Sequence, residues 1–304
     1  MLLHSKSLTN AGVAHAFTTR INGATLVYLH DQDQKAGEFN LGWTKHDEEA
    51  NVRANRAALL KTIDDEASER FTLVAIQQRH TPVLRIIRDY DQPFTAENGR
   101  AVLRGDALAT NLPDLLLAIQ TADCIPVLVY DPKRRVVAAF HAGWRGTLAR
   151  IVERGIGTLR LEYGCNPKDL IAAIGPGIGP ESYSVGEEVR HEFESQFAYA
   201  NELFTEVYDS NPVRDKYPML FLTARAPGHS PIGPQIHLDL WKANHHQLLD
   251  AGLLEKNIDL LAEDTAANTD RYFSHRREEG FTGRMMSVIG LKAAPAKKKA
   301  KKKK

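Results

Sequence analysis

A cysteine and a histidine lie at the outer ends of two apolar runs that a short polar segment joins. Cys124 precedes the run IPVLVY, His141 follows the run RVVAAF, and Asp131–Arg134 separates the two runs. Apolar runs of this length around a Pro-containing turn are typical of a β-hairpin. With Asp131–Arg134 as the loop, Tyr130 pairs with Arg135, and the same register sets Cys124 directly opposite His141. Their Cβ atoms would then lie about 5 Å apart.

This pairing suits two kinds of chemistry. The thiolate and the imidazole could bind one zinc ion, with a Zn–S distance of about 2.3 Å and a Zn–N distance of about 2.0 Å, or act as a nucleophile and its base. His80, in AIQQRH, follows a further strand-like run and offers a second imidazole. One cysteine and two histidines leave the fourth position of a tetrahedral zinc open, which is typical of a catalytic site. We therefore predict His80, Cys124 and His141 as catalytic residues and metal ligands, with copper as the alternative metal.

Arginines beside glycine turns indicate a site for an anionic group. Arg145, in AGWRGT, lies at a turn before a helix expected from about Thr147, where backbone N–H groups and the helix dipole also favour an anion. Near the C-terminus, FSHRREEGFTGR places Arg276 and Arg284 around two glycines. These two arginines either bind an anionic substrate or form ion pairs with the neighbouring glutamates.

Short β-rich runs alternate with helical patterns and would position these side chains. Several of the runs are apolar throughout, which indicates strands covered on both faces. The expected strands are 71–76, 83–87, 115–119, 125–130, 135–140 and 170–174. Apolar residues at helical spacing indicate helices over 52–63 and 148–159, and Asp239 is a candidate N-cap for a helix over 240–249. We predict a single α+β domain over residues 1–291, with layered mixed sheets and helices outside.

The composition is that of a globular chain. Of 304 residues, 43% are hydrophobic and 25% charged, which excludes collagen, coiled coil and wholesale disorder. No run of 18 apolar residues exists, and the first residues lack the apolar stretch of a secretory signal, so we expect no contact with a membrane. The two cysteines, Cys124 and Cys165, are too few for a disulfide framework, so we expect a cytoplasmic location.

The charge is unevenly distributed. Seven lysines lie in residues 297–304, and without them the chain has 32 basic and 38 acidic residues, a net charge of −6. We expect residues 292–304 to form a disordered, Lys-rich tail. Such a tail could make a weak, salt-sensitive contact with nucleic acid or another polyanion.

Blocks along nearly the whole chain resemble the bacterial laccase-domain family, whose members are also called YfiH-type or multicopper polyphenol oxidase-like proteins. TADCIPVLVYD (121–131) and FHAGWRGT (140–147) are the most specific of these blocks. The others are HAFTTR (15–20), FNLGW (39–43), NVRANRAAL (51–59), RGDALAT (104–110), GPGIGPESYSVGEEV (175–189), LDLWKAN (238–244) and FSHRREEGFTGRMMSVIGL (273–291). The family includes animal proteins that are purine nucleoside phosphorylases.

The resemblance implies a layered α/β/β/α sandwich and maps the family's metal site onto His80, Cys124 and His141. It also implies phosphorolysis of adenosine, inosine and methylthioadenosine, with adenosine deamination as a side activity. The implied partners are therefore a small-molecule nucleoside and phosphate. The residues expected to contact substrate or phosphate are Arg145, Arg276, Arg284 and Asn40. Asp123 and Asp106 are candidates for the acid that helps the purine to leave.

Two features depart from the family pattern. Family members often carry cysteines where this chain has Glu181–Tyr183 and Asp264–Ala266, and His275 stands where a tyrosine is usual. Three other classes of function also stay open. They are a copper-dependent polyphenol oxidase, a metal-free Cys/His hydrolase acting on peptidoglycan precursors, and a module that binds nucleic acid through the tail.

Overall fold

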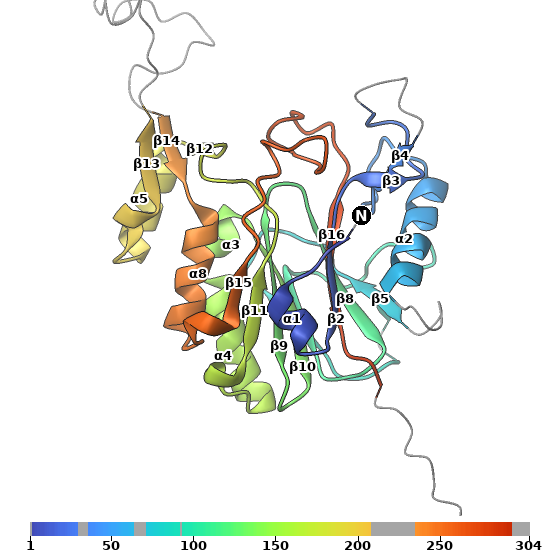
Figure 1. Cartoon of the computed structure of the whole chain (residues 1–304), viewed down its shortest axis with the longest axis horizontal. Coiled ribbons are helices and arrows are strands. Elements are labelled where there is room, and N and C mark those ends of the chain that lie inside the picture. Colours follow the sequence, from blue (N-terminus) through green and yellow to red (C-terminus); the bar gives the residue numbers. More distant parts are fainter. Residues whose placement is uncertain (1, 30–35, 64–70, 92, 208–234, 294–304) are drawn as a thin grey trace, which may run out of the picture.

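The chain folds into four layers, two β-sheets face to face with helices on both outer sides (Figure 1). This computed structural model describes residues 2–29, 36–63, 71–91, 93–207 and 235–293. The predicted Lys-rich tail lies outside the described residues from position 294 onward. None of the described helices is long and apolar enough to span a membrane.

Two mixed sheets form the middle layers. One has the spatial order β1 (Leu2–Leu3), β2 (Ala14–Thr18), β16 (Met285–Gly290), β8 (Leu115–Thr121) and β5 (Thr72–Ala75). The other has the order β15 (Ile258–Leu260), β11 (Ile171–Ile174), β9 (Ile125–Asp131), β10 (Val136–Ala142), β7 (Ala107–Thr110) and β6 (Leu84–Ile87). Two small sheets lie outside this pair, namely β12 (Ser184–Val185), β14 (Gln235–Leu238) and β13 (Phe204–Val207), and β3 (Ile21–Gly23) with β4 (Gly37–Glu38).

The helices cover the outer faces of the large sheets. The described α-helices are α1 (Lys6–Asn10), α2 (Glu49–Ile63), α3 (Trp144–Leu148), α4 (Ile151–Tyr163), α5 (Glu187–Gln196) and α8 (Leu240–Asp250). Short 3₁₀ turns lie at Pro167–Asp169, Ala200–Glu202 and Glu255–Asn257. Helices α4 and α8 cover the six-stranded sheet, whereas α2 packs on the five-stranded sheet.

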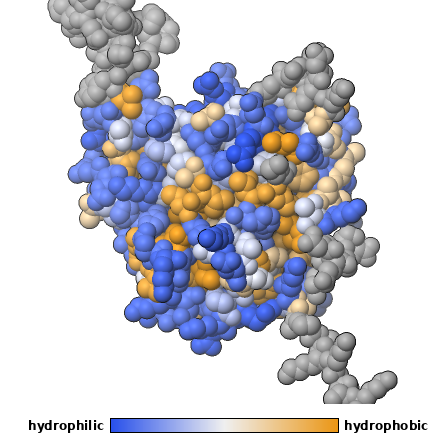
Figure 2. Space-filling model, viewed as in Figure 1, coloured by the Kyte–Doolittle hydropathy of each residue, from blue (hydrophilic) through white to orange (hydrophobic). Residues whose placement is uncertain are grey.

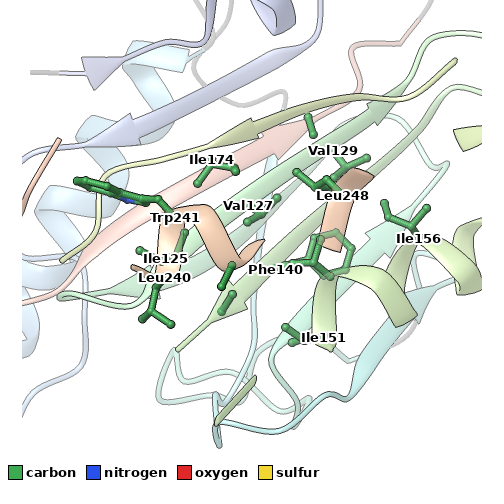
Figure 3. Close-up of a cluster of buried hydrophobic side chains, with 14 of the residues drawn as sticks. Ile125, Val127, Val129, Phe140, Ile151, Ile156, Ile174, Leu240, Trp241 and Leu248 are labelled. Carbon is green, nitrogen blue, oxygen red and sulfur yellow. The ribbon is translucent and has the colours of Figure 1, made fainter. Parts of the chain in front are cut away.

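Strand β9 shows why its sequence is apolar throughout. Val127 and Val129 belong to the cluster packed under α4 and α8, together with Phe140, Ile156 and Leu248 (Figure 3). Leu128 and Tyr130 point to the opposite side, into the layer between the two sheets. Both faces of the strand are therefore buried, as its sequence predicts. The predicted α/β/β/α arrangement in a single mixed domain is confirmed.

The expected helix over 148–159 is interrupted. Helix α3 ends at Leu148, and α4 begins at Ile151. Between them, Arg150 adopts a left-handed φ of 58°, which turns the chain. The periodicity of the apolar residues did not reveal this break. Asp239 does cap α8, because its side chain accepts a hydrogen bond from the backbone N–H of Lys242 at 2.8 Å.

The β9–β10 hairpin forms, but the predicted register is wrong by two residues. Asp131 pairs with Val136, and His141 therefore lies opposite Pro126 rather than Cys124. The reason is that the Asp131 side chain accepts hydrogen bonds from the backbone N–H groups of Lys133 and Arg134, at 2.8 and 2.9 Å. Asp131 thereby stays in the strand and caps a turn that begins one residue later than predicted. A shift of two preserves the face of the sheet, so Cys124 and His141 still point to the same side.

Candidate functional site

The structure brings together the three predicted metal ligands, His80, Cys124 and His141. His80 lies in the loop after β5, Cys124 lies where the chain crosses from β8 in one sheet to β9 in the other, and His141 lies in β10. One ligand atom from each lies within 4.8 Å of the others. Cys124 Sγ is 3.9 Å from His80 Nε2, and the two imidazole centroids are 5.0 Å apart. The site therefore joins three segments that are remote in sequence.

Asp106 organises two of these segments. Its fully buried carboxylate accepts a hydrogen bond from His141 Nδ1 at 2.9 Å and from the backbone N–H groups of Arg79, His80 and Thr81 at 2.7–3.1 Å. Burial alone would raise the pKa of Asp106, but the hydrogen bonds from His141 and Thr81 hold it well below its usual range. The bond to Nδ1 leaves His141 Nε2 for the site. The same carboxylate also holds His80 in its left-handed conformation, with φ 58°.

The cysteine and the buried histidine influence each other's ionisation. Burial raises the pKa of the Cys124 thiol, yet the charges and hydrogen bonds of His141 and His80 outweigh it and bring the pKa down to about 6. Burial lowers the pKa of His141, but the Cys124 thiolate and Asp106 raise it to about 9. At neutral pH the pair is therefore a thiolate beside an imidazolium, which is suited to binding a cation in place of the histidine proton.

The three side chains fit a tetrahedral zinc ion. Sulfur and nitrogen ligands of one zinc lie about 3.5 Å apart, given the usual bond lengths, and the Cys124 Sγ to His80 Nε2 distance of 3.9 Å is close to this value. The carboxylate behind His141 is the usual outer partner of a zinc-bound imidazole. Space for the thiol comes from Gly143, where a Cβ atom would lie only 2.8 Å from Cys124 Sγ. The same set of two histidines and one cysteine also suits copper.

A cavity of about 570 Å³ opens beside the three side chains. Its wall includes His80, Cys124 and His141, and also side chains that the sequence did not identify, among them Trp43, Gln78 and Arg100. Gln78 holds the wall together, because its amide donates to Gln120 O at 2.6 Å and accepts from Gln120 N at 2.7 Å. The position of Gln78 in AIQQRH, close to His80, could have identified it from the sequence as a residue of the site. Trp43 and Arg100 carried no such signal, since they come from distant segments.

The four predicted substrate-binding residues lie in different places. Arg284 lines the cavity. Asn40 is fully buried behind it, and the Asn40 side-chain oxygen accepts a hydrogen bond from Arg284 N at 2.9 Å. Arg145 is exposed on the short helix α3, with its guanidinium 4.1 Å from the centroid of the Trp144 ring, and it does not line the cavity. Among these four, Arg284 alone faces the cavity directly.

Arg276 and Asp123 join two loops next to the cysteine. The Asp123 carboxylate accepts hydrogen bonds from Arg276 N at 2.6 Å and from Thr265 Oγ1 at 2.7 Å. The Arg276 side chain donates to Ser184 O at 2.8 Å. Both Asp123 oxygens and both Asp106 oxygens are thus engaged as acceptors of hydrogen bonds from the protein, and neither candidate acid lines the cavity. As for the expected ion pairs, Glu278 pairs with Arg20 of a distant segment, at 2.9 Å.

The segments that lack the family's cysteines also meet near this site. Ser182 Oγ donates a hydrogen bond of 2.6 Å to Asp264 Oδ2. A polar contact therefore connects the two loops. His275, which stands in place of the usual tyrosine, lies in the wall of the cavity that contains Cys124.

A second large cavity lies elsewhere. It measures about 660 Å³ and is lined by residues of β1, β2, α2 and adjoining loops, including Leu2, Val13 and Phe39. Figure 2 shows hydrophobic side chains gathered in the middle of the face that carries α1 and the N-terminal strands. None of the three predicted metal ligands lines this cavity, so the three side chains converge at the smaller of the two.

Known proteins resemble this chain over almost its full length. A family model described as multi-copper polyphenol oxidoreductase laccase matches residues 14–292. A purine nucleoside phosphorylase of Bacteroides thetaiotaomicron is 32% identical over 95% of each chain, and one of Deinococcus radiodurans is 33% identical over 93% of this chain and 90% of the relative.

Solved structures agree with this relationship. YfiH of Bacillus licheniformis has a TM-score of 0.77 and 28% identity over 96% of both chains, and YlmD of Geobacillus stearothermophilus has a TM-score of 0.73 and 27% identity over 95% of this chain and 94% of that one. The resemblance seen in the sequence is thereby confirmed, and the chain belongs to the multi-copper polyphenol oxidoreductase laccase family.

Proposed function

We propose that this protein is a metal-dependent purine nucleoside phosphorylase that acts on adenosine, inosine and methylthioadenosine. The observation that carries the proposal is the cavity in which Cys124, His80 and His141 converge beside Arg284. The names of the relatives from Bacteroides thetaiotaomicron and Deinococcus radiodurans support the choice of reaction. Adenosine deamination in the same cavity is part of the proposal as a side activity.

The residues of the site have separate roles. His80, Cys124 and His141 would hold a zinc ion, which when bound would supply a Lewis acid beside the reactants. Asp106 keeps His141 and the backbone of His80 in place. The guanidinium of Arg284 binds an anion and favours the negatively charged reactant next to the sugar.

In phosphorolysis an oxygen of inorganic phosphate attacks C1′ of the ribose while the bond from C1′ to the purine nitrogen breaks. The products are the free base and ribose 1-phosphate. Positive charge develops on the sugar in the transition state, so an anion positioned beside it is stabilising. The departing purine must gain a proton, which the attacking hydrogen phosphate supplies in the overall balance. Asp106 and Asp123 do not line the cavity, and their carboxylate oxygens accept hydrogen bonds from the protein.

A product assay tests the proposal. We expect the full chain to convert inosine and phosphate into hypoxanthine and ribose 1-phosphate, and to release adenine or inosine from adenosine. Cys124→Ser should lower kcat/KM by about a thousandfold, because it removes a ligand and a charge together. Cys165→Ser is the matched control, since Cys165 is buried in the core away from the cavity. Absence of products from zinc-loaded protein would refute the proposal.

A metal-free Cys/His hydrolase is a second candidate, favoured by the thiolate–imidazolium pair of Cys124 and His141. Such an enzyme, acting for instance on peptidoglycan precursors, would keep its activity in a strong chelator and lose it on treatment with iodoacetamide. The phosphorylase should behave in the opposite way towards the chelator.

Copper-dependent polyphenol oxidation is a third candidate, since two histidines and a cysteine also match an electron-transfer copper site. Among the described residues, no other group of three His, Cys, Asp or Glu side chains is placed to hold a metal. A blue absorption band in copper-loaded protein, together with oxidation of a phenol, would favour this candidate.

A further inference from the structure

A smaller cavity adjoins the one that contains the metal ligands, and Arg284 belongs to the walls of both. It measures about 290 Å³ and shares three wall residues, Trp43, Gln120 and Arg284, with the cavity that contains Cys124. The remaining wall includes Lys45 and His46, which follow Trp43 in the chain. A ligand in the larger cavity would therefore lie next to a second compartment, with Arg284 between the two.

The side cavity is lined by basic groups. Lys45, His46 and Arg284 belong to its wall, and none of the described residues that line it is acidic. Aspartates nearby are already engaged. Asp47, next to His46, accepts hydrogen bonds from Thr25, Asn40 and Asn51. This local excess of positive charge stands out in a chain whose residues before the terminal lysine cluster carry a net charge of −6.

Arg284 presents an unused edge of its guanidinium. Its Nη1 donates to the carbonyl oxygens of Thr282 and Gly283, at 3.0 and 2.7 Å. Among the described residues, none accepts a hydrogen bond from its Nε or Nη2, and no carboxylate lies in an ion pair with it. An Nε–Nη2 edge is the fork that binds two oxygens of a phosphoryl group.

The protein is built to hold Arg284 in this position. A Cβ atom at Gly42 would lie 2.6 Å from both Cβ and Cγ of Arg284, so the arginine stem occupies the space that glycine leaves. The buried Asn40 side chain binds the backbone N–H groups of Arg284 and Gly42, at 2.9 and 3.0 Å. The arginine is thus fixed at its base, and its free edge stays available.

We propose that the side cavity is a binding site for a phosphoryl group, held by Arg284 and Lys45 with His46 beside them. The group is either inorganic phosphate, the co-substrate, or the 5′-phosphate of a nucleotide whose base and sugar occupy the larger cavity. Its part in turnover rests on the proposed phosphorylase function, whereas binding itself does not.

Binding is measured first, by calorimetry on the zinc-loaded full chain with inorganic phosphate and with inosine 5′-monophosphate. Lys45→Ala should weaken the binding of at least one of them by about tenfold, the effect of losing one charged hydrogen bond. Arg284→Lys, which keeps the charge but loses the fork, should weaken the same ligand. Lys292→Ala is the matched control, because Lys292 lines the unrelated cavity beside β1 and β2.

Kinetics then distinguish the two sources of the phosphoryl group. If free phosphate binds here, Lys45→Ala raises the KM for phosphate by about tenfold and leaves the KM for inosine unchanged. If a nucleotide binds here, wild-type protein binds inosine 5′-monophosphate about tenfold more tightly than inosine, and Lys45→Ala removes that advantage.

The proposal is overturned if Lys45→Ala and Arg284→Lys leave the affinities for phosphate and for inosine 5′-monophosphate within twofold of wild type. Should wild-type protein bind these ligands but form no product from inosine, the proposed function fails while the site stands. If wild-type protein forms product but both variants keep the wild-type affinities for phosphate and inosine 5′-monophosphate, the proposed phosphoryl site is rejected while the proposed function stands.

Discussion

Strand β9 has a cysteine near each of its ends, and the two thiols have opposite properties. Cys124 immediately precedes the strand and is partly exposed in the cavity wall, where His141 and His80 lower its pKa to about 6 despite burial. Cys165 is 2% exposed and lies beside Asp131, the last residue of the strand. Burial and the neighbouring Asp131 carboxylate raise its pKa to about 12.

The contrast shows that the charge of the neighbours decides the chemistry of a thiol in this fold. Two imidazoles turn Cys124 into an anion that can bind a metal, whereas burial and the Asp131 carboxylate keep Cys165 neutral and part of the core. Each of the two thiol regions also has a buried aspartate. Asp106 binds the histidine side of the site, and Asp131 caps the hairpin turn.

The largest expected effect is on thiol alkylation. In chelator-treated protein at pH 7, Cys124 should be mostly thiolate and Cys165 almost entirely thiol, because the pKa of Cys124 is lowered to about 6 and that of Cys165 is raised to about 12. Iodoacetamide should therefore modify Cys124 and leave Cys165 unmodified, as read by peptide mass spectrometry. The rate at Cys124 should rise with pH to a plateau, with a midpoint near pH 6.

Zinc provides the control for this experiment. Addition of zinc should protect Cys124, because a ligated sulfur is a poor nucleophile towards the reagent, and should have no effect on Cys165. Equal modification of the two cysteines in folded protein would contradict the assigned environments.

Substitution of Asp106 or of Asp131 should have a smaller effect. Asp106→Asn removes the charge behind His141 and sets an amide NH₂ against backbone N–H donors, so we expect zinc affinity to fall by about 10–100-fold. Asp131→Asn is the matched control, since Asp131 caps a turn and touches none of the three ligands. Competition with a chromophoric chelator measures both. A fall of similar size in the control would mean that general destabilisation is responsible.

The sequence located several strands, among them β9 and β10, and selected the three candidate ligands, because these depend on local pattern. Apolar runs located β9 and β10, and the residue types at their ends selected Cys124 and His141. The predicted register was wrong because the pairing depends on one side chain, that of Asp131. Asp131 accepts hydrogen bonds from the turn and therefore remains the last residue of the strand. A shift of two kept both residues on one face, so the expected grouping survived the wrong pairing.

Other features of the site could not be found from local pattern. Asp106 acts through hydrogen bonds to residues 25–35 positions away, and Trp43 and Lys45 reach the cavity walls from a segment that precedes α2. Asn40 belongs to a recognisable block, yet burial shows it to hold Arg284 rather than to face the cavity. The positions of these side chains follow from the way the two sheets pack together, and the sequence of one segment does not predict that packing.

The smallest expected effect tests the corrected register. Extending the observed pairing by one residue sets Gly143 opposite Cys124, and a Cβ atom there would lie 2.8 Å from Cys124 Sγ and 3.2 Å from His80 Cδ2. The φ of Gly143, −72°, suits alanine, so Gly143→Ala should act through this contact and not through backbone strain. We expect zinc affinity to fall by about tenfold, since the thiol must move from its place.

Gly157→Ala is the matched control, at a position where an added Cβ atom contacts nothing. Gly157 lies within α4, and a Cβ atom there meets no atom within 4 Å. This substitution should raise the free energy of unfolding by about 0.5–1 kcal/mol and leave zinc affinity unchanged, because alanine favours the helix. Zinc titration and urea unfolding of both variants provide the measurement. If Gly143→Ala binds zinc as tightly as wild type, then Cys124 does not lie against Gly143, and the register that places it there is incorrect.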